Sequence, residues 1–80
     1  MPRFFFDVTD RELIVDNSGD ELPDANAARI KAISKLSDIN KDVVGDTGNR
    51  ELVVVIRGDK GQAIYRASLS FKAGWVSEPT

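Results

Sequence analysis

Cysteine and histidine are both absent from this sequence of 80 residues. Without cysteine there can be no disulfide and no thiolate metal ligand, and without histidine the commonest general base and metal ligand is missing. No apolar run is longer than residues 52–56, which is far too short to span a bilayer. The net charge of −2 gives no general attraction to nucleic acid or anionic lipid. We therefore expect no enzyme, no metal site, no cofactor and no membrane protein.

What is present is ordinary globular composition, with 30% charged and 41% apolar residues. A chain of this length forms one domain, and its thin core gives a modest stability. Asp7 directly follows the three phenylalanines at positions 4–6, so no secretory hydrophobic segment is expected there. We predict a cytoplasmic protein with one domain over residues 1–72 and a C-terminal tail over residues 73–80.

Four segments are rich in β-branched, aromatic and alternating residues, which predicts strands over 3–8, 12–16, 51–57 and 62–72. The first two strands form a hairpin, and the glycines at 58 and 61 predict a tight turn between the last two. A helix lies between the two hairpins, so the element order is ββαββ. The predicted fold is α+β: a four-stranded antiparallel sheet in the order 2-1-3-4, with one helix on one face.

The stretch DNSGDELPD gathers four carboxylates around a glycine and a proline, which suits either a metal loop or the start of a helix. A calcium loop built around Gly19 places Ile14 and Ala25 at ligand positions, and neither side chain can ligate. Pro23 fits the first turn of a helix, where a missing N–H costs nothing, and Asp24 can cap the free N–H groups. The helix start is therefore the favoured interpretation.

The predicted helix runs over residues 24–44, with Gly45 as its left-handed stop. Its apolar stripe at helical spacing consists of Ala25, Ala28, Ala32, Leu36, Ile39 and Val43. Arg29 interrupts this pattern because it projects close to the stripe.

Two charged residues therefore stand out as a possible anion or ion-pair site: Arg29 on the helix and Asp7 in an apolar strand. Arg29 can bind an anion or a partner's carboxylate with both guanidinium nitrogens. Alternatively, it lies along the sheet edge and pairs with a carboxylate at position 7, 16 or 21, which is the favoured interpretation. Asp7 is expected to pair with Arg3 or Arg57 across the sheet.

Alternation along the strands assigns the side chains to two faces of the sheet. The face expected under the helix carries Phe4, Phe6, Val8, Leu13, Val15, Leu52, Val54, Ile56, Tyr65, Ala67, Leu69 and Phe71. The other face carries Phe5, Ile14, Val53, Val55 and Ile64, and a single helix leaves it uncovered. An exposed apolar patch of a few hundred Å² usually marks an interface.

Three hypotheses account for this second face. The tail can fold back so that Trp75 covers the patch, or a second copy can cover it in a two-fold dimer, which helps a small core most. A nucleic-acid-associated regulator is the third, since Phe5 lies among Arg3, Arg57, Arg66 and Lys72, but three acidic residues nearly balance these cations. We predict a small protein-interaction module that forms a homodimer, with Phe5, Ile14, Val53, Val55, Ile64 and Trp75 as its interaction surface.

The segments MPRFFFDV, DNSGDELPDANAAR and ASLSF resemble a family of short bacterial proteins of uncharacterised function, common in soil- and plant-associated proteobacteria. Its members begin with Met-Pro and aromatic residues, and continue with Asp-x-x-Gly-x-Glu-Leu-Pro-Asp and an alanine- and arginine-rich helix. The resemblance covers nearly the whole chain and implies a small stand-alone cytoplasmic domain. It implies no activity, and the tail with Trp75 departs from the usual short ending.

Overall fold

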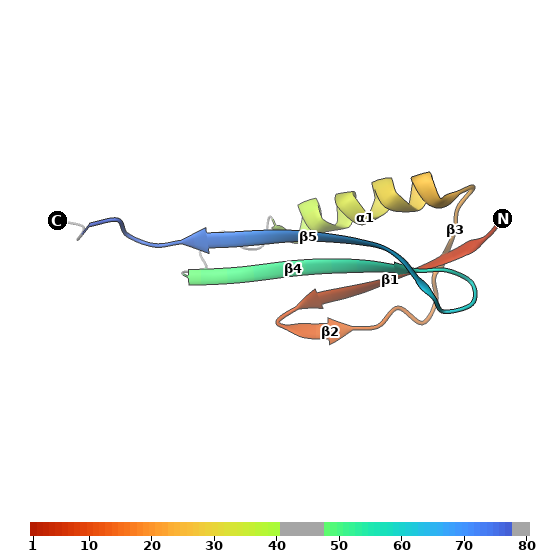
Figure 1. Ribbon diagram of the computed structural model, residues 1–80, viewed down its shortest axis with the longest axis horizontal. Coiled ribbons are helices and arrows are strands. Elements are labelled where there is room, and N and C mark those ends of the chain that lie inside the picture. Colours follow the sequence, from red (N-terminus) through yellow and green to blue (C-terminus); the bar gives the residue numbers. More distant parts are fainter. Residues whose placement is uncertain (41–47, 78–80) are drawn as a thin grey trace.

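The computed structural model describes residues 1–40 and 48–77. The secondary-structure elements of this part are β1 (Arg3–Asp10), β2 (Glu12–Ile14), β3 (Asp20–Glu21), α1 (Ala25–Asn40), β4 (Gly48–Arg57) and β5 (Ala63–Ala73). Figure 1 shows α1 lying along the sheet, with the N-terminus and the end of the described tail at opposite ends of an elongated molecule. None of the helical structure described here is long and apolar enough to cross a membrane.

The sheet is antiparallel, with the order β2-β1-β4-β5 and with β3 also paired to β1. The α+β class, the single helix and the antiparallel sheet are confirmed. The prediction of four strands is wrong, because the two-residue β3 makes a fifth. The four longer strands follow the expected order, but β2 and β3 share one edge of β1: β2 pairs with residues 8–10 and β3 with residues 3–4.

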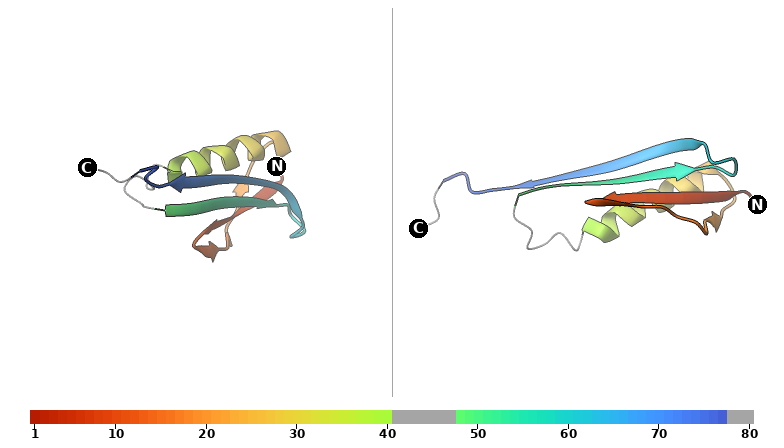
Figure 2. Two further views of the ribbon diagram at one scale, coloured as in Figure 1. Left: turned by 60° about the vertical axis from the view of Figure 1, so that its left-hand side comes forward. Right: turned by 90° about the horizontal axis from the view of Figure 1, so that it is seen from below.

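The core lies between α1 and one face of the sheet, which we call the helix-bearing face. Its buried residues are Phe4, Phe6, Ala28, Ala32, Leu36, Leu52, Val54 and Ile56. The two small alanines face the sheet and let the helix approach it closely, and Figure 2 shows α1 on one side of the strands. Leu13 and Val15, which were predicted in this core, are largely exposed instead.

Asp24 begins the helix as predicted, because its Oδ1 accepts a hydrogen bond from the Ala27 amide at 2.8 Å. This is the geometry of an N-cap, in which a side-chain oxygen satisfies a free N–H of the first turn. Ala25, the first helical residue, is exposed, whereas the later alanines of the stripe are buried. The predicted end of the helix, with Val43 and the stop at Gly45, lies outside the described residues.

The turn between β1 and β2 places the side chains of β2 on the opposite faces from those predicted. Arg11 alone separates the two strands, with a φ of 71°, and this one-residue turn sets Ile14 opposite Val8 and Leu13 opposite Thr9. Directly opposed residues share a face. Ile14 therefore lies on the helix-bearing side, so its predicted place on the second face is wrong. Leu13 lies on the second face, which we call the open face.

β4 and β5 extend beyond the end of β1, as Figures 1 and 2 show. The pairing of β1 with β4 ends at Asp10 and Leu52, so residues 48–51 of β4 pair only with residues 70–73 of β5. We call this two-stranded extension the arm. β5 reaches Ala73, one residue past the predicted domain boundary.

Candidate functional site

The edge of β1 is interrupted between β2 and β3, and the carboxylate of Asp16 fills the interruption. Its Oδ2 accepts a hydrogen bond from the Phe6 amide at 3.1 Å, and its Oδ1 accepts from the Ser18 and Gly19 amides at 3.0 Å each. Burial by itself raises the pKa of this carboxyl, but the three backbone donors, with the charge of Lys35, bring that pKa below its ordinary value. The side chain thus replaces the strand that is missing at this point.

Arg3 holds the loop after Asp16 against β1. Its Nη1 donates to the Ser18 carbonyl oxygen at 2.8 Å, and its Nη2 forms an ion pair with the Glu21 carboxylate at 3.0 Å. The Asp20 carboxylate accepts from Lys31 of α1 at 2.6 Å. Each carboxylate of residues 16–24 therefore accepts backbone hydrogen bonds, caps the helix or forms a local ion pair. The part of the chain described here groups no three metal-ligating side chains.

Asp7 lies on the open face, where Arg57 binds it with two nitrogens at 2.6 and 3.1 Å. The same guanidinium donates to the Asp16 carbonyl oxygen at 2.8 Å, and the Asp16 amide donates back to Asp7 at 2.9 Å. The hydrogen bonds and charge of Arg57 hold the pKa of Asp7 below its ordinary value, against the opposing effect of burial. Of the two partners predicted for Asp7, the structure shows Arg57. This group ties β1, β4 and the loop together.

These contacts predict a loss of stability in acid. Asp7, Asp10 and Asp16 all have a pKa below the ordinary 3.8, with Arg50 lowering the pKa of Asp10. A carboxyl with a lowered pKa stabilises the fold above its unfolded-state pKa, and this contribution disappears as the pH falls through the folded-state pKa. Urea midpoints should therefore be steady from pH 7 to about pH 5 and fall below about pH 4. A midpoint unchanged down to pH 2 would contradict this.

Arg29 does not reach the sheet carboxylates that were predicted as its partners. Its Nε and Nη2 both donate to the Asn26 Oδ1, at 3.1 and 2.9 Å, one helical turn earlier. Residues three apart are neighbours on a helix surface, so the spacing of Asn26 and Arg29 is the signal that sequence reasoning missed. Arg29 is half-buried.

The predicted interaction surface is only partly assembled. Phe5, Val53 and Val55 share the open face, where Val53 is only 8% exposed and the other two are half-buried. Ile64 lies where the pairing of β4 and β5 shifts register. Trp75 is 81% exposed, so it does not cover the patch. Leu13 also lies on the open face, where it is 62% exposed, although the sequence analysis predicted it on the face under the helix.

The cations proposed for a nucleic-acid surface are partly occupied by other contacts. The Arg57 guanidinium lies 5.0 Å from the centre of the Phe5 ring, and it also pairs with Asp7. Arg66 and Lys72 have no ion-pair partner among residues 1–40 and 48–77. A base that stacks on Phe5 would compete with Arg57 for the same ring. Nucleic-acid binding remains a prediction from the sequence.

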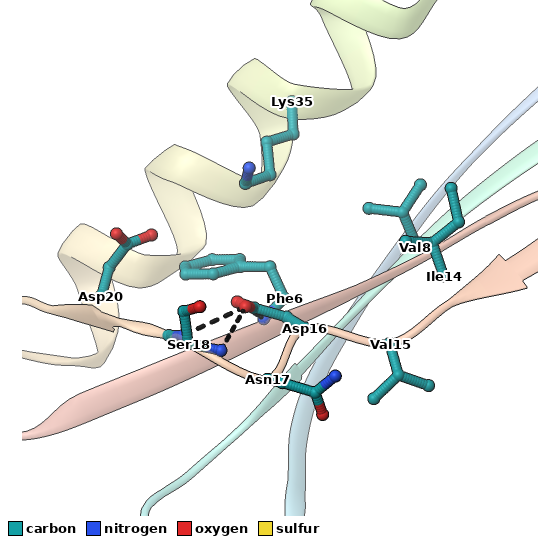
Figure 3. A pocket seen from close by; sticks show the side chains of 10 residues that line it. Phe6, Val8, Ile14, Val15, Asp16, Asn17, Ser18, Asp20 and Lys35 are labelled. Carbon is teal, nitrogen blue, oxygen red and sulfur yellow. Dashed lines mark hydrogen bonds between the residues drawn. The ribbon is translucent and has the colours of Figure 1, made fainter.

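A shallow pocket of about 550 Å³ lies beside the interrupted edge, on the helix-bearing face. Figure 3 shows the Phe6 ring between the Asp16 turn and Lys35 of α1, with Val8 and Ile14 side by side. Both oxygens of Asp16 accept hydrogen bonds from backbone amides, so this carboxylate joins the wall of the pocket to β1.

The comparisons with known proteins identify a family. A family model described as a domain of unknown function, DUF6894, matches residues 3–70. The chain belongs to this family. The matched segment begins at β1 and includes α1, β4 and most of β5, so the family covers both the interrupted edge and the open face. No curated protein and no solved structure matches the chain significantly.

Proposed function

We propose that this domain is a small protein-interaction module that self-associates through the open face of its sheet. The observation that carries this proposal is an apolar strip across three strands, formed by Leu13 of β2, Phe5 of β1 and Val53 and Val55 of β4. α1 covers the opposite face, and neither α1 nor the exposed Trp75 covers this strip, of which Leu13 is the most exposed member. Exposed apolar patches rimmed by polar residues are typical of protein–protein interaction sites, among other kinds of binding site.

Charges at the edge of the strip support a second copy as the partner. Arg66 lies opposite Val55, and Glu51 lies further along β4 on the same face. Both side chains are exposed. Two copies related by a two-fold axis can therefore place Arg66 of one against Glu51 of the other, around the apolar strip.

Leu13 and Ile14 provide a matched test because they are adjacent, similarly exposed at 62% and 59%, and on opposite faces. Leu13→Asp places a charge within the proposed contact, so we expect association through the open face to weaken at least tenfold, since a buried unpaired charge is costly. Ile14→Asp should leave self-association unchanged. Sedimentation at protein concentrations from micromolar to near-millimolar, with circular dichroism to check folding, gives both results.

Equal behaviour of the two variants would contradict the open face as the contact surface. If both variants and the unmodified chain sediment as monomers at the highest concentration, self-association through this face is excluded.

A further inference from the structure

The two edges of the sheet differ in length and in how they are protected. On the β1 side, the edge consists of the short β2 and β3 with Asp16 bound across the interruption. On the other side, β5 is extended over residues 63–73, contains no proline and is the last strand of the sheet in the described chain. Its register shift is confined to the end that pairs with Arg57. Long unprotected edges are templates for another strand.

The helix-bearing face beside this edge is also apolar and partly empty. Tyr65, Ala67 and Leu69 of β5 form, with Ile33 and Leu36 of α1, a shallow groove of about 470 Å³. Ile33 and Tyr65 remain well exposed at the groove. A further strand beside β5 would bring side chains over this groove.

The arm provides the third observation. Residues 48–51 and 70–73 form a two-stranded ribbon with no third strand among the described residues. A ribbon of two strands is at best marginally stable in water. Phe71 on the arm is partly buried against the core, and the neighbouring Lys72 and Ala73 are exposed.

We propose that β5 pairs with β5 of a second copy, antiparallel, about a two-fold axis at Ser68. Ser68 is the central residue of β5, so this register uses the full length of the strand. The pairs it creates are Tyr65 with Phe71 and Ala67 with Leu69 on the helix-bearing face, and Arg66 with Ser70 on the open face. Aromatic pairs on neighbouring strands stabilise a sheet.

The charges on β5 select this register over its neighbours. An axis at Leu69 sets Arg66 opposite Lys72 twice in each dimer, and directly opposed like charges destabilise a sheet. An axis at Ala67 shortens the ladder and sets Phe71 opposite Ala63. Only the axis at Ser68 combines the longest ladder with no opposed cations.

The same register supports both arms. Residues 70–73 of one copy pair with residues 63–66 of the other, where β4 and the core lie behind β5. Phe71 then enters the groove of the second copy beside Tyr65 and Ile33. The partner that fits this surface is therefore another copy of this chain, and the contact does not require the open face.

Single cysteines test the register, because the natural chain has none. Directly opposed residues have Cα atoms about 4.5–5.5 Å apart, within the range of a disulfide. Ser68→Cys should therefore give a covalent dimer under mild oxidation. Ser70→Cys is the matched control, since the two copies of residue 70 would lie about 14 Å apart at 3.4 Å per residue. Equal or faster cross-linking of Ser70→Cys would overturn the proposal.

Charge reversal at the axis gives a second readout that needs no covalent bond. Ser68 lies opposite Val53 on the open face, so this test is made in the Leu13→Asp background, where the open-face contact is already weakened. There, Ser68→Lys and Ser68→Glu should each lose the dimer in sedimentation, and mixing them should restore it as a heterodimer. A dimer that survives in both variants overturns the proposal, as does an unmodified chain that stays monomeric near millimolar concentration. Leu13→Asp should leave this dimer intact, so failure of the edge contact and failure of the open-face contact are distinguishable.

Discussion

Replacing Gly19 with alanine should lower the free energy of unfolding by about 2–4 kcal/mol. Gly19 has a φ of 71°, a left-handed conformation that costs other residues about 1–2 kcal/mol. A Cβ at this position would lie 2.9 Å from the Phe4 carbonyl oxygen, and equally close to the side chains of Arg3 and Phe5. Arg3 and Phe5 side chains can move, but the carbonyl belongs to the backbone of β1. The loop must therefore withdraw from the strand that it covers.

Gly61 provides the matched control for this prediction. Its φ of 82° is equally left-handed, but a Cβ there would meet no atom within 4 Å. Gly61→Ala should therefore show only the conformational cost, about 1–2 kcal/mol. Urea denaturation of both variants measures the difference. If Gly19→Ala is no more destabilised than Gly61→Ala, the close approach of the loop to β1 contributes nothing to stability.

Replacing Asp16 with alanine should have the second large effect, a loss of about 2–4 kcal/mol. Three backbone N–H groups, at Phe6, Ser18 and Gly19, would lose their acceptor in one substitution. Each unsatisfied donor costs about 1–3 kcal/mol when buried, and access of water to the turn reduces the total. The amides of Phe6 and Gly19 should also exchange with solvent faster, and hydrogen exchange followed by NMR gives this site by site.

Asp59 is the control for Asp16, because its Oδ1 accepts a single exposed backbone bond, from the Arg3 amide at 2.8 Å. Asp59→Ala should cost about 1 kcal/mol or less. Asp16→Asn should fall between the two, since an amide oxygen can still accept two of the three bonds. A loss for Asp16→Ala no larger than that for Asp59→Ala would show that the turn does not depend on its carboxylate.

The sheet and helix were accessible to sequence reasoning because their patterns are strong. Alternation in 3–8, 51–57 and 62–72 gave the correct faces for Phe6, Val54 and Ala67, which all contact the helix-bearing core. The N-cap at Asp24 was likewise readable, since one residue type at one position supplies the acceptor. Residues close together in the sequence decide both the strand faces and the N-cap.

The sequence could not predict which side chains of β2 lie on which face of the sheet, because this depends on the length of one turn. Leu13 and Ile14 are both apolar, so the pattern fits either face equally well. The positive φ of the turn residue Arg11 decides which of them lies opposite Val8, and arginine gives no sequence signal for that conformation. A two-residue strand such as β3 is too short to show an alternating pattern in the sequence.

The contacts of Asp16 and Arg57 escaped prediction for a different reason. They join positions 7, 16 and 57, which are brought together only after the sheet has formed. Asp16 begins a local turn, since its Oδ1 accepts hydrogen bonds from the Ser18 and Gly19 amides. Its second oxygen binds the Phe6 amide of β1, and no local pattern predicts a bond across ten positions of the chain.

The interrupted edge of β1 also limits how large an assembly can grow. A sheet with two open edges can add copies head to tail without end, and such heterologous growth produces fibres. Here one edge is short, bent and bound to a side chain, so a copy added there would have to displace Asp16 from the Phe6 amide. A sheet that is open on one edge only can be extended by strand pairing once, so the bond of Asp16 to the Phe6 amide would limit edge-to-edge growth as well as stabilise the fold.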